Sequence, residues 1–435
     1  MSNLDSSTAI KNVLIVTSSG GGGLLQAANA KEQEILSEYP NATVVQRDVM
    51  KHWMWKGLGS FFAAQWNRAQ LRGDVFYQTL LGNYGAPLME YFFWPHIFVC
   101  SLVTIYKRDI DRVIDTQVMG TSALIKALRI FNWTRKKKII LEKILVDLPT
   151  PKATHFFKAI KSLSNGDKKY FKLITIAPLL KEGQTEEEFW KLNCNLTNAE
   201  LKYEDFYVRQ AFRAYRNTQI KRRDTSLTLK YKNSEELNLI QRSVSKGTLQ
   251  PIIGDHQIEY PVAEKDRVVT ILLGSQPSRE GTLGYVRQFI QLANEIHVPT
   301  HLFVFCADHK PGSVSLMKAV SDTVAKTLDF PRHLTVIPMS FQSDKEIAPL
   351  FHRSDITCTR SGGQTAMEIM SVGTGDPWVH SEAKMGKGPL SEEALLAGIP
   401  VWESANAVYM QRMVGAKLVT PDSFIPYARK VLLGG

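Results

Sequence analysis

The chain has 435 residues, of which 44% are hydrophobic and 22% charged, proportions that fit a soluble globular protein and exclude a disordered or fibrous one. This length is long for one domain and sufficient for two domains with separate cores. The formal net charge of +11 indicates an anionic partner: a nucleic acid, an acidic lipid surface or a phosphate-bearing substrate.

The four cysteines are scattered, without CxxC spacing or a nearby histidine cluster. This pattern predicts neither a zinc site nor a disulfide framework, so we expect a reducing compartment and no bound metal. The first eleven residues are polar and lack the apolar core of a secretory signal. We therefore expect a cytoplasmic protein, with peripheral binding to a membrane as a further expectation.

The first predicted unit begins with a short, β-branched apolar run at residues 12–17, followed by four glycines and a helical pattern. These features predict a strand, a glycine turn and a helix. Gly21, Gly22 and Gly23 give the turn a bare backbone, and we expect a ligand to lie on it. No Lys-Ser/Thr pair follows as in a Walker loop, so nucleotide hydrolysis is disfavoured.

Residues 52–106 are dense in aromatic side chains, with lysines and arginines between them. Such a stretch is typical of a surface at a lipid interface, and equally of a helical core. We keep both interpretations. The most apolar window, residues 89–106, contains Glu90, Pro95 and His96, so we expect a buried or interfacial segment rather than a transmembrane helix.

Another apolar run, residues 139–147, predicts a strand that ends at Asp147. The carboxyl ends of strands are where α/β sheets bind their ligands, which makes Asp147 a candidate site residue. A solvated loop acid is the competing interpretation.

Residues 181–232 are highly charged and weakly periodic, which predicts one or two surface helices and a connector. We count residues 181–262 as one charged helical segment. No nucleic-acid reader motif accompanies the basic residues, so we expect a solvated basic face and no nucleic-acid partner. We assign this charged helical segment to the end of an N-terminal domain, residues 1–262. Residues 263–435 form the C-terminal domain, whose last helix is a candidate for packing back on the N-terminal one.

The C-terminal half repeats the pattern of strand and helix, beginning with an apolar run at residues 268–273 that Gly274, Ser275 and Gln276 close. Further strands are predicted at residues 301–306 and 334–337. The same rhythm in both halves predicts an α/β protein with two Rossmann-like domains facing across a cleft.

The stretch from Asp355 to Met370 has the pattern of a phosphate-binding turn: an apolar run, a glycine-bearing loop and a helix start. Gly362 and Gly363 allow close approach of an anion, and Thr365 adds donors at the helix N-terminus. Glu368 repels phosphate but suits a sugar diol. An ordinary strand–helix turn with a solvated Glu368 is the alternative.

These segments together resemble the two-domain GT-B glycosyltransferases, most closely the branch of the monogalactosyldiacylglycerol synthases and the UDP-GlcNAc transferase of peptidoglycan synthesis. The resemblance extends over most of the chain and lies in motifs that are each weak alone. They are Ser18–Ala30, Val146–Lys158, Gly274–Gln276, Ser361–Glu368 and Glu403–Tyr409.

The resemblance implies a UDP-sugar donor bound without a metal or other cofactor by the C-terminal domain, and an acceptor bound by the N-terminal domain. Helix-end N–H groups would stabilise the leaving diphosphate. Glu403 and Asn406 would contact the sugar. The other residues implied in donor binding are Ser275, Gln276, Ser361, Gly362, Gly363, Gln364, Thr365 and Glu368.

One departure concerns the base. The family carries a histidine after its glycine loop, and this chain has Leu24 there, which cannot accept a proton. Gln117 likewise replaces a histidine of the lipid synthases. Either Asp147 is the base, with His52, His96 and His155 as further candidates, or the protein binds a nucleotide sugar without transferring it.

We therefore carry three hypotheses. The leading one is a metal-independent glycosyltransferase that moves a sugar from a UDP-type donor to a lipid or membrane-proximal acceptor. The second is a catalytically degenerate GT-B protein that binds nucleotide sugars or regulates a partner. The third is a transferase for a protein or soluble acceptor.

Overall fold

The computed structural model divides the chain into two compact units. The first contains Met1–Trp66 and Thr79–Arg209, and the second contains Asn67–Gln78 and Gln210–Gly435. The structure describes residues 10–19, 22–135, 138–216, 221–307, 313–384 and 389–433.

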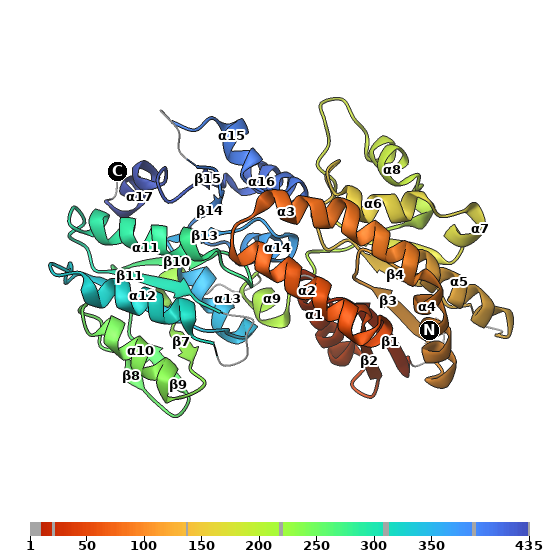
Figure 1. Cartoon of the computed structure of the whole chain (residues 1–435), viewed down its shortest axis with the longest axis horizontal. Helices are drawn as coiled ribbons and strands as arrows, with labels where there is room; N and C mark the ends of the chain where they lie inside the picture. Colours follow the sequence, from red (N-terminus) through yellow and green to blue (C-terminus); the bar gives the residue numbers. More distant parts are fainter. Residues whose placement is uncertain are drawn as a thin grey trace, which may run out of the picture. The chain divides into compact units, whose positions relative to one another are not determined.

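The sheet of the first unit has six parallel strands in the order β2-β1-β3-β4-β5-β6 (Figure 1). Strand β1 is apolar along its length, because parallel strands are covered on both faces; Val13, Leu14, Ile15 and Val16 have no exposed surface. The strands are β1 (Asn12–Thr17), β2 (Thr43–Asp48), β3 (Arg112–Asp115), β4 (Leu141–Ile144), β5 (Phe171–Thr175) and β6 (Leu201–Tyr203).

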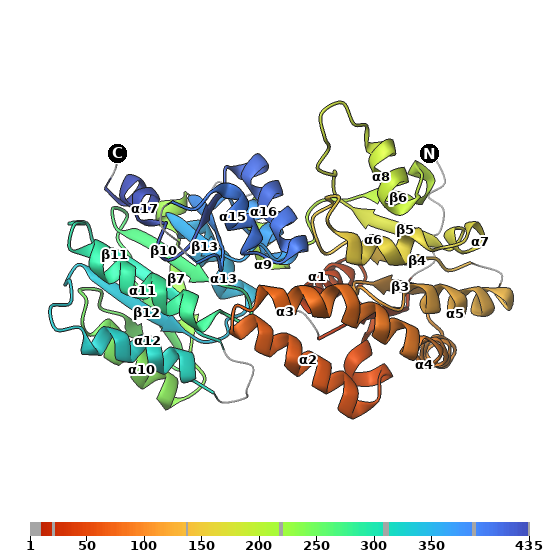
Figure 2. The same ribbon diagram turned by 45° about the horizontal axis from the view of Figure 1, so that its top comes forward.

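Helices connect these strands, and α4 packs side by side with α5 (Figure 2). Helix α2 and helix α3 carry the chain through Asn67–Gln78, the segment that belongs to the second unit. The helices are α1 (Gly22–Glu38), α2 (Lys56–Leu71), α3 (Val75–Leu80), α4 (Ala86–Lys107), α5 (Thr121–Trp133), α6 (Thr154–Lys161), α7 (Asn165–Lys168) and α8 (Glu186–Cys194).

The second unit also has a six-stranded parallel sheet, in the order β12-β11-β10-β13-β14-β15. This is the strand order of the dinucleotide-binding fold, with its reversal point between β10 and β13. The strands are β10 (Arg267–Leu272), β11 (Thr300–Phe305), β12 (Leu334–Met339), β13 (Ile356–Thr359), β14 (Asp376–His380) and β15 (Lys417–Val419).

The helices of this sheet form two layers. Helix α11 packs beside α12, and α13 packs beside α14, as right-handed crossovers in opposite directions require (Figure 1). The helices are α11 (Arg279–Ala293), α12 (Ser315–Lys326), α13 (Asp344–Arg353), α14 (Gly363–Val372), α15 (Glu392–Ala397), α16 (Val401–Val414) and α17 (Ile425–Leu432).

The domain boundary predicted between residues 262 and 263 lies later than the structural division at Arg209 and Gln210. Residues 210–262 belong to the second unit because α9 packs on α13 and α14, and α10 packs on α12 and β12. The last helix, α17, also belongs to the second unit, where Arg429 pairs with Glu295 at 2.7 Å.

Residues 181–262 contain strands in addition to the predicted helices and connector. The segment also contains β6 and a three-stranded antiparallel sheet, β7-β9-β8. In β7 and β9 every second side chain is buried, but charged residues on the exposed face hide this short alternation in the sequence. The elements not yet given are α9 (Gln210–Arg216), β7 (Leu227–Lys230), α10 (Ser234–Val244), β8 (Ile252–Ile253) and β9 (Gln257–Tyr260).

One continuous helical stretch among the described residues, Val75–Lys107, is long and apolar enough to cross a membrane by length and composition. Core helices of soluble proteins meet the same criterion, and 28% of its most apolar window is buried. The stretch begins with α3, passes through a π-helical turn at Leu81–Gly85 and ends with α4.

Candidate functional site

In the second unit, the loops after β10 and β13 meet at the reversal point of the strand order. The first loop is Gly274–Gln276 and the second begins at Arg360. Gly274 has φ +82°, which favours glycine, and a Cβ there would lie 3.7 Å from Cδ of Arg360. Open α/β sheets bind their ligands at this position, so the two predicted donor segments come together in space.

The second loop leads directly into helix α14. Gly362 precedes the helix in extended conformation, and no atom lies within 4 Å of a Cβ built on it. The helix dipole and the N–H groups at the start of α14 favour an anion at this open position. Gln276, in the facing loop, has a buried Oε1 atom without a hydrogen-bond partner.

Glu368 lies one turn into α14 and is buried, with 3% of its surface exposed. Its Oε1 atom accepts a hydrogen bond from Nε2 of Gln364 at 3.2 Å. This burial argues against the alternative of a solvated Glu368. Thr365, on the same turn, is half-buried, so the predicted donor residues of this loop form one continuous group.

Glu403 and Asn406, predicted to contact the sugar, hold the loop after β13. Nδ2 of Asn406 donates to the carbonyl oxygen of Ser361 at 2.8 Å, and Oγ of Ser361 donates to the carbonyl oxygen of Glu403 at 2.7 Å. Asn406 is fully buried. We therefore interpret Asn406 as a residue that positions the loop.

Arg360 is a central residue of this loop that the sequence analysis did not single out. Its Nη2 atom donates to Glu403 Oε2 at 3.1 Å and to Gln78 Oε1 at 2.8 Å. Both partners are buried. The guanidinium thus joins α16 and the Asn67–Gln78 segment to the loop after β13. The sequence signal that pointed to Arg360 was its position directly before Ser361, in the segment predicted to bind the donor.

Glu382 is a second residue that the sequence analysis missed. It follows β14 at the same sheet edge and pairs with His380 at 3.2 Å. Burial opposes ionisation of Glu382, but His380 and Arg360 together lower its pKa to about 2. The carboxylate is therefore charged across the physiological pH range, and it lies beside the loop after β13. Its neighbours in sequence carry no recognisable motif.

In the first unit, the reversal point lies between β1 and β3, after the glycine turn. Gly21 lies outside the described residues; Gly22 and Gly23 are half-buried and begin α1. The carbonyl oxygen of Leu24 accepts hydrogen bonds from Thr17 and Thr116 at 3.0 and 3.1 Å. Position 24 thus lies at the sheet edge, where the family resemblance predicts a base, but with a leucine side chain.

Asp147 and His155, separate candidates in the sequence, form a pair. The distance from His155 Nε2 to Asp147 Oδ2 is 2.9 Å. Asp147 follows β4 and His155 lies on the first turn of α6, so the connection after β4 brings them together. A carboxylate that accepts from one imidazole nitrogen fixes the tautomer and leaves the other nitrogen as the basic one.

His155 borders a small pocket of about 210 Å³. The pocket lies among α4, the loop after β3 and α6, all within the first unit. Its polar lining includes Asn83, Glu90, His155, Lys158 and Ser162. We call it the polar pocket.

Beneath this region lies a fully buried ion pair between Asp115 of β3 and Lys143 of β4. Lys143 Nζ donates to Asp115 Oδ2 at 2.8 Å and also to the backbone oxygen of Gln117. Asp115 further accepts from Thr121 Oγ1 at 2.9 Å and from the backbone N–H of Gln117 at 3.0 Å. The network fixes the loop after β3.

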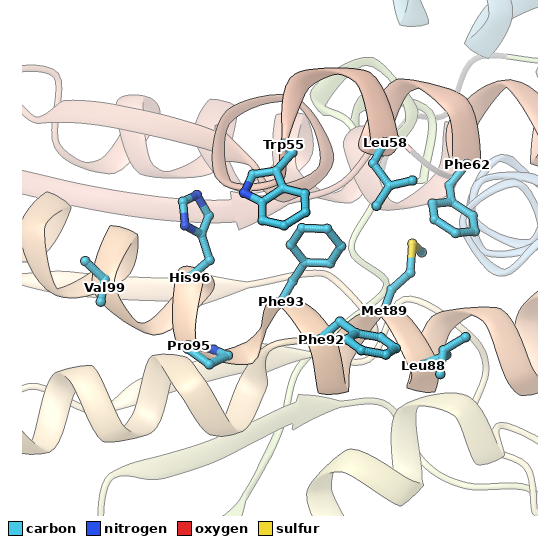
Figure 3. Close-up of a pocket in the computed structure, with 10 residues that line it drawn as sticks. All are labelled: Trp55, Leu58, Phe62, Leu88, Met89, Phe92, Phe93, Pro95, His96 and Val99. Atoms are coloured by element: carbon cyan, nitrogen blue, oxygen red, sulfur yellow. The ribbon is translucent and has the colours of Figure 1, made fainter.

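His96, the third candidate base, lies apart from the Asp147–His155 pair. It borders an apolar pocket of about 610 Å³ between α2 and α4, where Phe93 packs edge-to-face on Trp55 at 5.6 Å. Figure 3 shows Met89 and Phe93 of α4 pointing toward Trp55, Leu58 and Phe62. We call this the apolar pocket. Its lining offers His96 no carboxylate partner.

Within the described parts of the chain, no three or more His, Cys, Asp or Glu side chains are grouped so that they could hold a metal ion.

No protein-family model matches the sequence, and no curated protein sequence matches it. Solved structures do. The Arabidopsis thaliana UGT89C1 complex with UDP-L-rhamnose is 10% identical, with 98% of this chain and 90% of that chain covered and a TM-score of 0.50. MurG of Acinetobacter baumannii is 12% identical, with 97% and 90% covered and a TM-score of 0.43.

A third similar structure is the UDP-GlcNAc 2-epimerase of Methanocaldococcus jannaschii in complex with UDP-GlcNAc and UDP. It is 11% identical, with 97% of this chain and 93% of that chain covered and a TM-score of 0.44. At such identities the likeness concerns the fold alone. The chain has the GT-B fold, with two parallel α/β units, and the predicted fold class is confirmed.

Proposed function

We propose that the protein is a metal-independent glycosyltransferase that uses a UDP-type nucleotide sugar. The observation that carries the proposal is the Asp147–His155 pair at 2.9 Å, which supplies the base that Leu24 cannot. The open N-terminus of α14 beside the loop after β10 supports donor binding in the second unit. The solved UDP-sugar complexes with this fold support the donor class.

In the proposed reaction, the acceptor hydroxyl oxygen forms a bond to the anomeric carbon, and the bond from that carbon to the diphosphate breaks. The electron pair leaves with the diphosphate, whose charge the α14 N–H groups stabilise. The hydroxyl proton passes to Nδ1 of His155, because Nε2 donates to Asp147. Asp147 then stabilises the imidazolium by its negative charge.

We further propose a lipid or membrane-proximal acceptor. The exposed face of α4 presents Leu88, Tyr91, Phe92 and Val99, each more than half exposed, next to the apolar pocket. Exposed apolar patches of this kind mark interaction surfaces. On the same helix Glu90 borders the polar pocket. An amphiphilic acceptor would therefore contact α4 with both its apolar part and its polar part.

The occupant proposed for this exposed face is an anionic membrane surface. The parts of residues 49–107 that belong to the first unit, residues 49–66 and 79–107, contain one acid, Glu90, against three lysines, Lys51, Lys56 and Lys107. Basic charge beside exposed aromatic residues suits anionic headgroups. Peripheral membrane binding of a cytoplasmic protein is part of this proposal.

Replacing Glu368 by alanine should abolish stabilisation by the donor while the protein remains folded. A panel of UDP-sugars read by thermal shift tests this, since a ligand at 100 times its Kd stabilises by about 2.7 kcal/mol. The matched control is Glu393→Ala, an exposed acid in the first turn of α15. If no UDP-sugar stabilises the parent, or if Glu368→Ala responds as the parent does, the donor assignment is wrong.

Anionic vesicles should bind the protein more tightly than neutral ones, and added salt should weaken the binding. Phe92→Asp should reduce vesicle sedimentation several-fold, because it places a charge on the exposed face of α4. Leu328→Asp, at an even more exposed apolar residue of the second unit, is the control and should change little. Equal loss in both variants, or binding that ignores lipid charge and salt, would contradict the proposed membrane surface.

A further inference from the structure

Glu90 faces the polar pocket from the wall that α4 supplies, and His155 lines the same pocket from α6. One carboxylate oxygen of Glu90, Oε1, accepts the backbone N–H of Gly120 at 3.1 Å. This bond fixes the orientation of the carboxyl group, whose other oxygen is Oε2. Two groups able to exchange protons or hydrogen bonds with a ligand therefore line one cavity.

Other buried polar atoms nearby lack partners. Gln117 has no exposed surface, and neither its Oε1 nor its Nε2 atom has a hydrogen-bond partner. Gln117 Nε2 lies 3.5 Å from the position of a Cβ on Gly120. Buried polar atoms are normally satisfied, and exceptions point to a missing water or ligand. The loop after β3 therefore holds a buried amide group whose hydrogen bonds a polar ligand would complete.

The charged groups around Glu90 are Asp115 of β3, Lys143 of β4, and His155 and Lys158 of α6. Burial raises the pKa of Glu90, and Asp115 raises it further, while the Gly120 bond and Lys143 act in the opposite direction. Raising the pKa extends the range in which Glu90 is a neutral acid, able to donate a hydrogen bond.

We propose that the polar pocket binds a small polyol-like group of the acceptor, with one hydroxyl at His155 and a neighbouring oxygen hydrogen-bonded by Glu90. Glu90 is then a specificity residue that selects acceptors with two adjacent oxygens over simple alcohols. The volume of about 210 Å³ is below the 300–1,000 Å³ of drug-sized sites, so only the reacting group enters. This inference rests on the proposed glycosyltransferase function.

The test compares two probes, 1-monooleoylglycerol with two adjacent hydroxyls and oleyl alcohol with one. The donor is the UDP-sugar that most stabilises the parent. Glu90→Leu should raise the KM for monooleoylglycerol about three- to tenfold, the usual range for one lost hydrogen bond, with little change in kcat. The KM for oleyl alcohol should not change.

Glu90→Gln can still donate a hydrogen bond and cannot ionise. Its KM for monooleoylglycerol should stay within a few-fold of that of the parent, because the amide can still hydrogen-bond the neighbouring oxygen. Glu187→Gln, an exposed acid on α8, is the control. Equal effects of Glu90→Leu on both probes, or a KM of Glu90→Gln raised as much as that of Glu90→Leu, would overturn the role of Glu90.

Different outcomes contradict the glycosyltransferase function and the acceptor class. If the parent neither transfers sugar to any probe nor hydrolyses any UDP-sugar, the glycosyltransferase function fails. If the parent hydrolyses the donor and modifies neither lipid probe, or prefers oleyl alcohol, the acceptor class inferred from the polar pocket is wrong.

Discussion

Replacing His155 by glutamine should lower sugar transfer, or donor hydrolysis as its proxy, by about 10²- to 10⁴-fold, the usual contribution of a positioned base. Glutamine keeps a polar side chain of similar length but cannot accept the proton of the hydroxyl. Donor binding should persist, because the donor loop lies in the second unit. Turnover rates and UDP-sugar thermal shifts, measured on the same samples, check both halves of this result.

Asp147→Asn should reduce turnover by at least about a hundredfold. The cause differs from that in His155→Gln, because the imidazole itself is still present. The amide can donate to the ring and favour the wrong tautomer, and it no longer stabilises the imidazolium. The double variant should be no slower than His155→Gln, because residues that act as a unit are not additive.

His96→Gln is the matched control, since His96 borders the apolar pocket without a carboxylate partner in its lining. The turnover rate of His96→Gln should stay within a few-fold of that of the parent. If His155→Gln and Asp147→Asn both turn over at the parental rate, the base lies elsewhere. If the parent turns over no donor at all but binds UDP-sugars, the degenerate, nucleotide-sugar-binding hypothesis is favoured.

The sequence sufficed for the fold and for the positions of the two glycine-bearing turns because their signals are local. The glycine turn before Leu24 and the loop at Ser361–Glu368 each follow an apolar run and precede a helix, and the structure places both at a reversal point of strand order. Periodicity and turn residues depend only on neighbours in the chain, which a single sequence displays directly.

The sequence did not reveal which candidates meet in space. Asp147 and His155 are eight residues apart, and the turn that pairs them carries no distinctive pattern. His96 was an equal candidate in sequence, but α4 directs it to the apolar pocket. Arg360 and Gln78 are far apart in the chain, so their hydrogen bond depends on tertiary packing alone.

Replacing Lys143 by methionine should destabilise the first unit by about 3–5 kcal/mol, the range for removing one partner of a buried ion pair. Lys143 and Asp115 have no exposed surface, so Asp115 would keep a charge in a dry site with only Thr121 and the Gln117 N–H as partners. Denaturant unfolding, with the midpoint and slope fitted for the transition of this unit, gives the measurement.

The control is Lys126→Met. Lys126 also pairs with an aspartate, Asp167, at 2.9 Å, but 40% of its side chain is exposed, and exposed pairs contribute only about 0–1 kcal/mol. Adding Asp115→Asn to Lys143→Met should recover a large part of the loss, because the uncompensated charge is removed. If Lys143→Met and Lys126→Met destabilise equally, or the second substitution recovers nothing, the Asp115 charge is not the cause. The loop after β3 that this pair holds, with Gln117 and Gly120, would then be fixed mainly by apolar packing.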